Sequence, residues 1–127
     1  MIVAFWCVLI AIFLPYLCTM VAKASGGYGL RDNHDPRAFL DNLQGFARRA
    51  HAAQLNSFEI TPAFAAAVII AYISEGAELV TINVLAVMFI TSRLLYIICY
   101  LADWAVLRSL VWFVGMGIVA SFFFVSM

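Results

Sequence analysis

The sequence predicts an all-α integral membrane protein, built as one up-down-up-down bundle of four helices. The first observation is composition: of 127 residues, 66% are hydrophobic and only 11% are charged. That is more apolar surface than one small soluble core can hide. The second is that the apolar residues fall into segments about as long as the roughly 20 residues that a spanning helix needs. The third is that the later links are short, and short links join antiparallel neighbours.

The first helix is predicted over residues 2–22, a stretch without any charged residue. A secretory signal peptide is the alternative interpretation, favoured by small residues just after this stretch. However, no positive segment precedes it, and it exceeds the 7–15 residues typical of a signal peptide's apolar core. We therefore expect a membrane-spanning helix. Pro15 inside it predicts a kink, with a neighbouring helix satisfying the carbonyl that proline leaves free.

Residues 23–43 form the only long polar connection. Within it, a Gly-Gly pair and an Asp-Pro pair are typical of turns. We expect Asp35 to cap a helix that Pro36 begins, on the approach to the second spanning helix. His34 beside Asp35 suits a metal or acid-base pair, but an ordinary solvated loop explains both residues as well.

The second helix, predicted over residues 44–74, carries polar side chains into the membrane. Its apolar part is residues 60–73, which as a helix is about 21 Å long, against a hydrocarbon core of about 30 Å. We therefore expect Gln54, Asn56 and Glu59 to lie at membrane depth. A carboxylate at that depth is costly, so Glu59 marks a candidate functional site.

The remaining two helices are predicted over residues 79–101 and 105–125, joined by a tight link at Asp103. Arg93 is the only charge in the first of these two helices, and Arg108 lies in the first turns of the second.

Polar residues share stripes on two of the predicted helices. Asn56 and Glu59 lie about 60° apart around their helix axis. Arg93, Tyr96 and Tyr100 together span only about 60° on theirs. Each helix therefore presents one polar stripe to its neighbours.

Positive charges predict the orientation. Five of them lie in or next to the long connection: Lys23, Arg31, Arg37, Arg48 and Arg49. The opposite link carries only Glu75 and Glu78. The positive-inside rule therefore places the long connection in the cytoplasm and both termini outside. It also brings the polar parts of the last three helices to one membrane level.

Several function classes are disfavoured. The formal net charge is zero, so the chain has no basic field for nucleic acid. No nucleotide-binding or zinc-binding spacing occurs. Cys7, Cys18 and Cys99 all fall in apolar segments and spell out neither a disulfide framework nor a metal site. We expect no metal.

Three motifs follow one another along the chain: Asn56-x-x-Glu59-x-x-Pro62, Arg93-x-x-Tyr96-x-x-x-Tyr100, and Arg108 at the start of the last helix. In this order they resemble the MAPEG superfamily, membrane-associated proteins in eicosanoid and glutathione metabolism. Its members include microsomal glutathione transferases and leukotriene synthases. The resemblance spans residues 1–127 as a single domain. Within the family, the motifs of this chain are most similar to those of the small bacterial branch.

The resemblance implies a homotrimer in the bacterial inner membrane, with glutathione held between subunits near the cytoplasmic side. Asn56 and Glu59 would bind the glutathione backbone, and Arg93 would take a carboxylate. Tyr96 and Tyr100 would donate hydroxyl hydrogen bonds.

Arg108 would match the arginine that in some members stabilises the glutathione thiolate. A guanidinium near sulfur favours the charged, nucleophilic form. The implied activity is a glutathione-dependent transferase or peroxidase that acts on lipophilic electrophiles dissolved in the membrane.

The chain departs from the family at Ala52, where an arginine is usual. Arg48 and Arg49 lie one turn earlier and are candidate replacements that would help to bind glutathione. The alternative is a non-catalytic membrane protein. In that case the same residues hold the helices together, for example through a buried ion pair between Glu59 and Arg93, or bind a lipid or thiol ligand.

Overall fold

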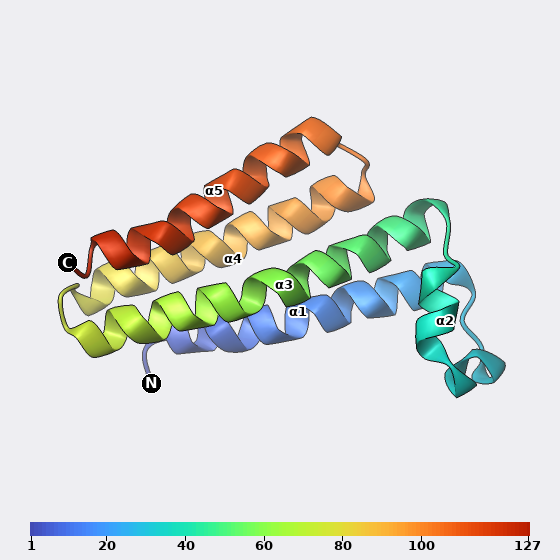
Figure 1. Ribbon diagram of the computed structural model, residues 1–127, viewed down its shortest axis with the longest axis horizontal. Coiled ribbons are helices and arrows are strands. Elements are labelled where there is room, and N and C mark those ends of the chain that lie inside the picture. The colour runs from blue at the N-terminus through green and yellow to red at the C-terminus, as the bar shows by residue number, and fades with distance from the viewer.

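The computed structural model describes residues 1–127, and all of its regular structure is helical (Figure 1). Four helices are long and apolar enough to cross a membrane, which confirms the all-helical, four-span prediction. The elements in chain order are α1 (Val3–Gly26), the 3-10 helix η1 (Leu30–His34), α2 (Pro36–Asp41), α3 (Gly45–Ser74), α4 (Leu79–Leu101) and α5 (Ala105–Phe124).

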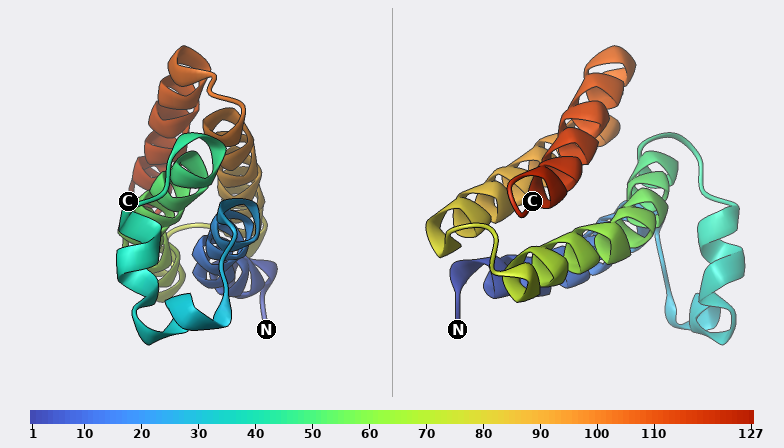
Figure 2. Two further views of the ribbon diagram at one scale, coloured as in Figure 1. Left: turned by 90° about the vertical axis from the view of Figure 1, so that its right-hand side faces the viewer. Right: turned by 60° about the vertical axis from the view of Figure 1, so that its left-hand side comes forward.

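The four long helices form two antiparallel pairs, α1 with α3 and α4 with α5 (Figure 1). Both termini lie at the same end of the bundle as the α3–α4 turn, and we call that end the terminal half. The opposite end, the loop half, holds η1, α2 and the α4–α5 link. Toward the loop half the α4–α5 pair turns away from the α1–α3 pair (Figure 2).

Helix α1 is longer than the sequence predicts, because it ends at Gly26 and not near residue 22. Gly27 stops it with a positive φ of 78°, and the Gly27 N–H bonds back to the Lys23 carbonyl. Glycine adopts this left-handed conformation without steric cost. A Cβ on Gly26 would lie only 2.5 Å from Leu43 Cδ2, so this glycine lets the connection pack closely against the helix end.

The connection is more ordered than a plain loop. The Asp35 carboxylate accepts a hydrogen bond of 3.2 Å from the Ala38 N–H, and Pro36 occupies the first turn of α2. This confirms the predicted cap. However, α2 ends at Asp41 and is a separate short helix, because the backbone leaves the helical path at Asn42 before α3 begins.

Aromatic side chains fill the core of the terminal half. Phe64 of α3 stacks on Phe89 of α4 with ring centres 4.0 Å apart, and Phe122 of α5 meets Phe64 edge-on at 6.1 Å. All three rings are fully buried. The α1–α3 contact is instead lined by buried alanines, which let helix backbones approach closely.

Two long-range hydrogen bonds tie α1 into the bundle. The Ala4 N–H, free at the helix start, donates to Asn83 Oδ1 of α4 at 2.9 Å. Proline at position 15 leaves the Ala11 carbonyl without its helical partner, and the Thr61 hydroxyl of α3 lies 3.3 Å from that oxygen. The same hydroxyl donates to the Ser57 carbonyl at 2.7 Å within α3, so the neighbouring helix supplies the Ala11 carbonyl with a shared donor, in partial agreement with the prediction.

Candidate functional site

Arg93 is the centre of the polar residues in the loop half. Its side chain is only 3% exposed. Nη2 donates to Asn56 Oδ1 at 2.7 Å and lies 3.4 Å from Ser57 Oγ, both on α3. Nε is buried without any hydrogen-bond partner. No carboxylate of the chain pairs with this guanidinium, since the only ion pair joins His51 and Asp41.

A series of stacked side chains leads from Arg93 to α5. The Arg93 guanidinium carbon lies 4.2 Å from the ring centre of Tyr96, whose ring meets Tyr100 edge-on at 5.8 Å. The guanidinium of Arg108 lies 4.3 Å from the Tyr100 ring centre. Cations over aromatic faces are attracted by the ring quadrupole. Two tyrosines in mutual contact thus lie between two arginines in one continuous group.

We call Asn56, Arg93, Tyr96, Tyr100 and Arg108 the polar cluster. Five of the eight predicted site residues are therefore brought together from α3, α4 and α5. The turn to left-handed backbone at Asp103, with φ of 61°, reverses the chain tightly enough to bring the start of α5 beside the end of α4.

A hollow of about 250 Å³ adjoins the polar cluster. Asn56, Tyr96 and Arg108 line its polar side, and Trp112 and Phe113 line the other. The two aromatic rings meet edge-on with centres 5.2 Å apart. The lining, which also includes Ser109, therefore combines one guanidinium, polar groups and aromatic rings within one subunit.

Glu59 lies one turn beyond Asn56 on α3 and is exposed on the surface of the single chain. It makes no ion pair within the chain. The alternative in which Glu59 and Arg93 form a buried ion pair is therefore wrong within one subunit. The acceptor of Arg93 is Asn56, because the amide rather than the carboxylate faces α4.

The two candidate replacements for the missing arginine differ. Arg49 is half-buried, and its Nε donates to the Leu101 carbonyl at the end of α4 at 3.2 Å. Arg48 is exposed, and its side chain makes no hydrogen bond or ion pair to the rest of the chain. Neither side chain makes a hydrogen bond, an ion pair or a cation–aromatic contact with a residue of the polar cluster within the single subunit. Ala52, which lies between these arginines and Asn56 in the sequence, brings no charge.

Two buried polar residues were not singled out as site residues from the sequence. Ser57 follows Asn56 in α3, and both side chains lie within hydrogen-bond distance of Arg93 Nη2. Gln54 was expected at membrane depth, and it is buried with its Oε1 2.9 Å from His51 Nδ1. A serine adjacent to the motif asparagine is a weak sequence signal, because serines are common in helices for other reasons.

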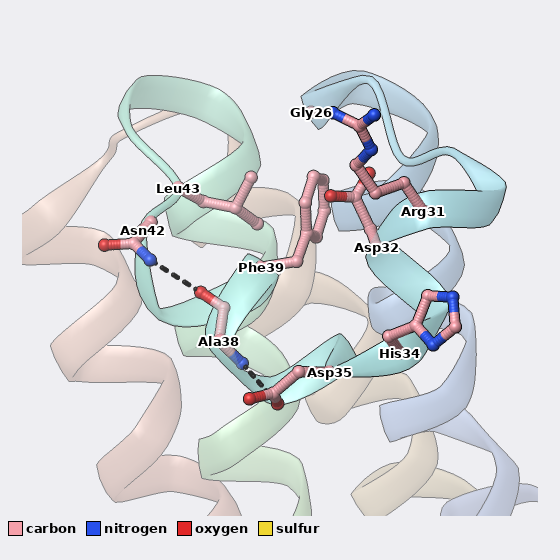
Figure 3. Close-up of a pocket in the computed structure, with 9 residues that line it drawn as sticks. All are labelled: Gly26, Arg31, Asp32, His34, Asp35, Ala38, Phe39, Asn42 and Leu43. Atoms are coloured by element: carbon pink, nitrogen blue, oxygen red, sulfur yellow. Dashed lines mark hydrogen bonds between the residues drawn. The ribbon is translucent and has the colours of Figure 1, made fainter.

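Another hollow, of about 490 Å³, lies in the connection and is lined by none of the residues of the polar cluster (Figure 3). Its polar atoms mostly stabilise the connection itself. Asp35 accepts from the Ala38 N–H, and Asn42 Nδ2 donates to the Ala38 carbonyl at 2.8 Å. His34 lies at its edge in a solvated position, as the loop interpretation expects.

The chemistry available in the loop half is anion binding. A guanidinium buried at membrane depth, without a carboxylate, is costly unless a ligand or another chain supplies the negative charge. Tyrosine hydroxyls and the second guanidinium of Arg108 add donors beside the hollow. No group of three or more histidine, cysteine or acidic side chains is close enough together to hold a metal ion.

Comparison with known families places these residues in a wider group. The chain matches the MAPEG family over residues 3–127, which include all four long helices and the polar cluster. Comparison with curated proteins and with solved structures gave no match. The resemblance predicted from the three motifs is thus confirmed over nearly the whole length. This multi-pass membrane chain belongs to the MAPEG family.

Proposed function

We propose that the protein is a glutathione-dependent transferase or peroxidase that acts on lipophilic electrophiles. The observation that carries this proposal is the buried guanidinium of Arg93, which has no anionic partner and an unbonded Nε. A carboxylate of glutathione would supply the missing charge. Charge-assisted hydrogen bonds of this kind are roughly twice as strong as neutral ones.

In this proposal the other members of the cluster hold the rest of the tripeptide. Asn56 and Glu59 bind its backbone, with Glu59 pairing with the amino group. The hydroxyls of Tyr96 and Tyr100 donate along the tripeptide. Arg108 stabilises the thiolate, because a nearby cation favours the charged form of sulfur.

The reaction is then a nucleophilic attack by sulfur. The glutathione thiol loses its proton, and the thiolate forms a carbon–sulfur bond with the electrophile. A leaving group departs with its bonding electron pair, or in an addition the carbanion takes up a proton. In the peroxidase reaction two glutathione molecules are oxidised to the disulfide, while the lipid hydroperoxide is reduced to alcohol and water.

We further propose that the active form is a homotrimer in the bacterial inner membrane, with glutathione bound between subunits near the cytoplasmic side. The exposed, unpaired Glu59 and Arg48 support this, since a neighbouring subunit can bring partners to both. The long connection would lie in the cytoplasm and both termini in the periplasm. Reporter fusions at each terminus and at residue 31 test this orientation.

The test of the activity is titration of the purified protein with glutathione by calorimetry, together with the ultraviolet absorbance of the thiolate. We expect binding with a thiolate signal in the wild type. Glu59→Gln and Arg93→Ala should weaken binding by about tenfold to a hundredfold. Arg31→Ala, which removes a charge from the exposed connection, is the matched control and should bind normally.

A non-catalytic protein is the second candidate. The bonds from Arg93 to Asn56 and from Arg49 to Leu101 favour it, because they join α3 to α4 without any ligand. Light scattering of each variant separates the two. If Arg93→Ala breaks the assembly as well as binding, the cluster is structural. Absence of binding at millimolar glutathione would rule out the proposed glutathione-dependent enzyme activity.

A further inference from the structure

A second hollow between α4 and α5 has the opposite character to the one beside the polar cluster. It has a volume of about 370 Å³. Six of its eight lining residues are hydrophobic, and none is charged. We call it the apolar groove, and its lining residues are Val87, Met88, Thr91, Ser92, Leu95, Val111, Val114 and Ile118.

The hydroxyl groups of the apolar groove offer no free hydrogen-bond donor. Its two hydroxyls are already used within α4. Thr91 Oγ1 donates to the Val87 carbonyl at 2.9 Å, and Ser92 Oγ donates to the Phe89 carbonyl at 2.6 Å. A ligand with a hydrogen-bond acceptor such as a carbonyl or phosphate oxygen placed here would leave that acceptor unsatisfied, which is costly in a water-free region. The chemistry therefore selects a hydrocarbon.

The groove lies at the depth where hydrocarbon is found. Residues 87–95 are central in α4 (Leu79–Leu101), and residues 111–118 are central in α5 (Ala105–Phe124). Both helices are long and apolar enough to cross a membrane. The groove is therefore near the middle of both spans, with every lining residue about one and a half helical turns or more from the nearer end of its helix.

Helices α4 and α5 approach each other closely beside Ser92, one of the lining residues of the groove. Gly115 is buried there, and a Cβ on it would lie 3.3 Å from Ser92 Oγ. Larger side chains that line the groove remain exposed, among them Val87 and Val114.

The size of the groove suits a single acyl chain. A water molecule occupies about 30 Å³ in the liquid, and a methylene group is of similar size, so the groove holds roughly a dozen carbons. Dispersion contacts along such a chain are small individually and large together.

A neighbouring subunit is a less suitable occupant. The groove and the polar cluster lie about 140° apart around α4. In this one respect the argument rests on the proposed function: a subunit seated over the polar cluster leaves the groove facing the bilayer. We propose that the apolar groove is a binding site for one acyl chain of a membrane phospholipid.

The test uses the whole protein reconstituted in vesicles of dioleoyl phosphatidylglycerol, extracted in mild detergent and weighed by native mass spectrometry. We expect one retained phospholipid per chain. Val87→Phe and Val114→Phe fill the groove from α4 and α5, and each should lower its occupancy by about tenfold. Val80→Phe, at a site 70% exposed on α4 outside the groove, is the matched control and should retain the lipid.

Lipid variation sharpens the result. Dioleoyl phosphatidylcholine should bind as well as phosphatidylglycerol, because the groove contacts the chain and not the headgroup, and a dihexanoyl lipid should be lost. Retention that depends on the headgroup and ignores both phenylalanine variants would overturn the proposal. So would a change of oligomeric mass in these variants, which would show a second copy in the groove. No step measures glutathione, so failure here leaves the proposed activity untouched.

Discussion

The terminal half and the loop half of the bundle are stabilised by different interactions. In the terminal half, Phe64, Phe89 and Phe122 pack together without any polar atom. In the loop half, the corresponding space between α3 and α4 holds the guanidinium of Arg93, bonded to an amide and stacked on a tyrosine. The first half is complete in one subunit, whereas the second leaves a donor unused.

The contrast between an aromatic core and a polar cluster indicates where a small membrane bundle can hold functional residues. Packing in the terminal half can fix the helices relative to one another, so the loop half need not be optimised for stability. Functional residues often reduce stability in this way. The following predictions test whether the two halves are as separate as their contacts indicate.

The largest expected effect is in the aromatic core. Phe89→Ala removes a ring stacked on Phe64 and leaves a cavity, so it should lower the free energy of unfolding by about 3 kcal/mol. Thermal unfolding in detergent measures this. Glutathione affinity of the folded fraction should stay unchanged if the halves are independent. Phe13→Ala, at an exposed ring of α1, is the control and should change stability little.

A smaller effect is expected in the loop half. Asn56→Leu removes the acceptor nearest to Arg93 and leaves a buried charge further unsatisfied, at a cost of about 2 kcal/mol. The double variant Asn56→Leu with Arg93→Met should recover stability, because replacing both partners by apolar groups can be neutral. Chemical unfolding of both proteins measures the difference. Equal stability of the single variant and the wild type would mean that Arg93 has another acceptor.

The hydrogen bond from the Ala4 N–H to Asn83 is expected to contribute less. Asn83→Ala leaves the start of α1 without its cap and should cost about 1 kcal/mol. Hydrogen exchange at the first turn of α1 should quicken at the same time. Asn42→Ala, which removes a bond in the exposed connection, should not affect that exchange. A glutathione defect in Asn83→Ala would show that the terminal half also shapes the site.

The smallest effect is expected at Arg49. Arg49→Gln loses the bond to the Leu101 carbonyl and a favourable charge at the end of α4, together about 0.5 kcal/mol. Calorimetry should then show normal glutathione binding, as for a residue that only caps a helix. A marked loss of affinity without loss of stability would instead place Arg49 in the binding site, as the replacement for Ala52.

Sequence reasoning is enough to establish the class of the protein and the limits of α3, α4 and α5 to within one residue at either end. Segment length and composition decide whether a segment crosses a membrane, and these are local properties. The motif order was enough to indicate the family. The end of α1 was missed because Lys23 suggests a membrane boundary, whereas the helix continues until Gly27 supplies the left-handed turn.

Only the tertiary structure decided which polar residues meet. Helical angles placed Asn56 and Glu59 on one stripe, but they do not give the rotation of α3 against α4, and that rotation makes Asn56 the partner of Arg93. The apolar groove was equally invisible, because its residues look like any other lipid-facing positions. The length and apolar composition of a segment follow directly from its own residues. Contacts between helices depend instead on how whole segments pack against one another.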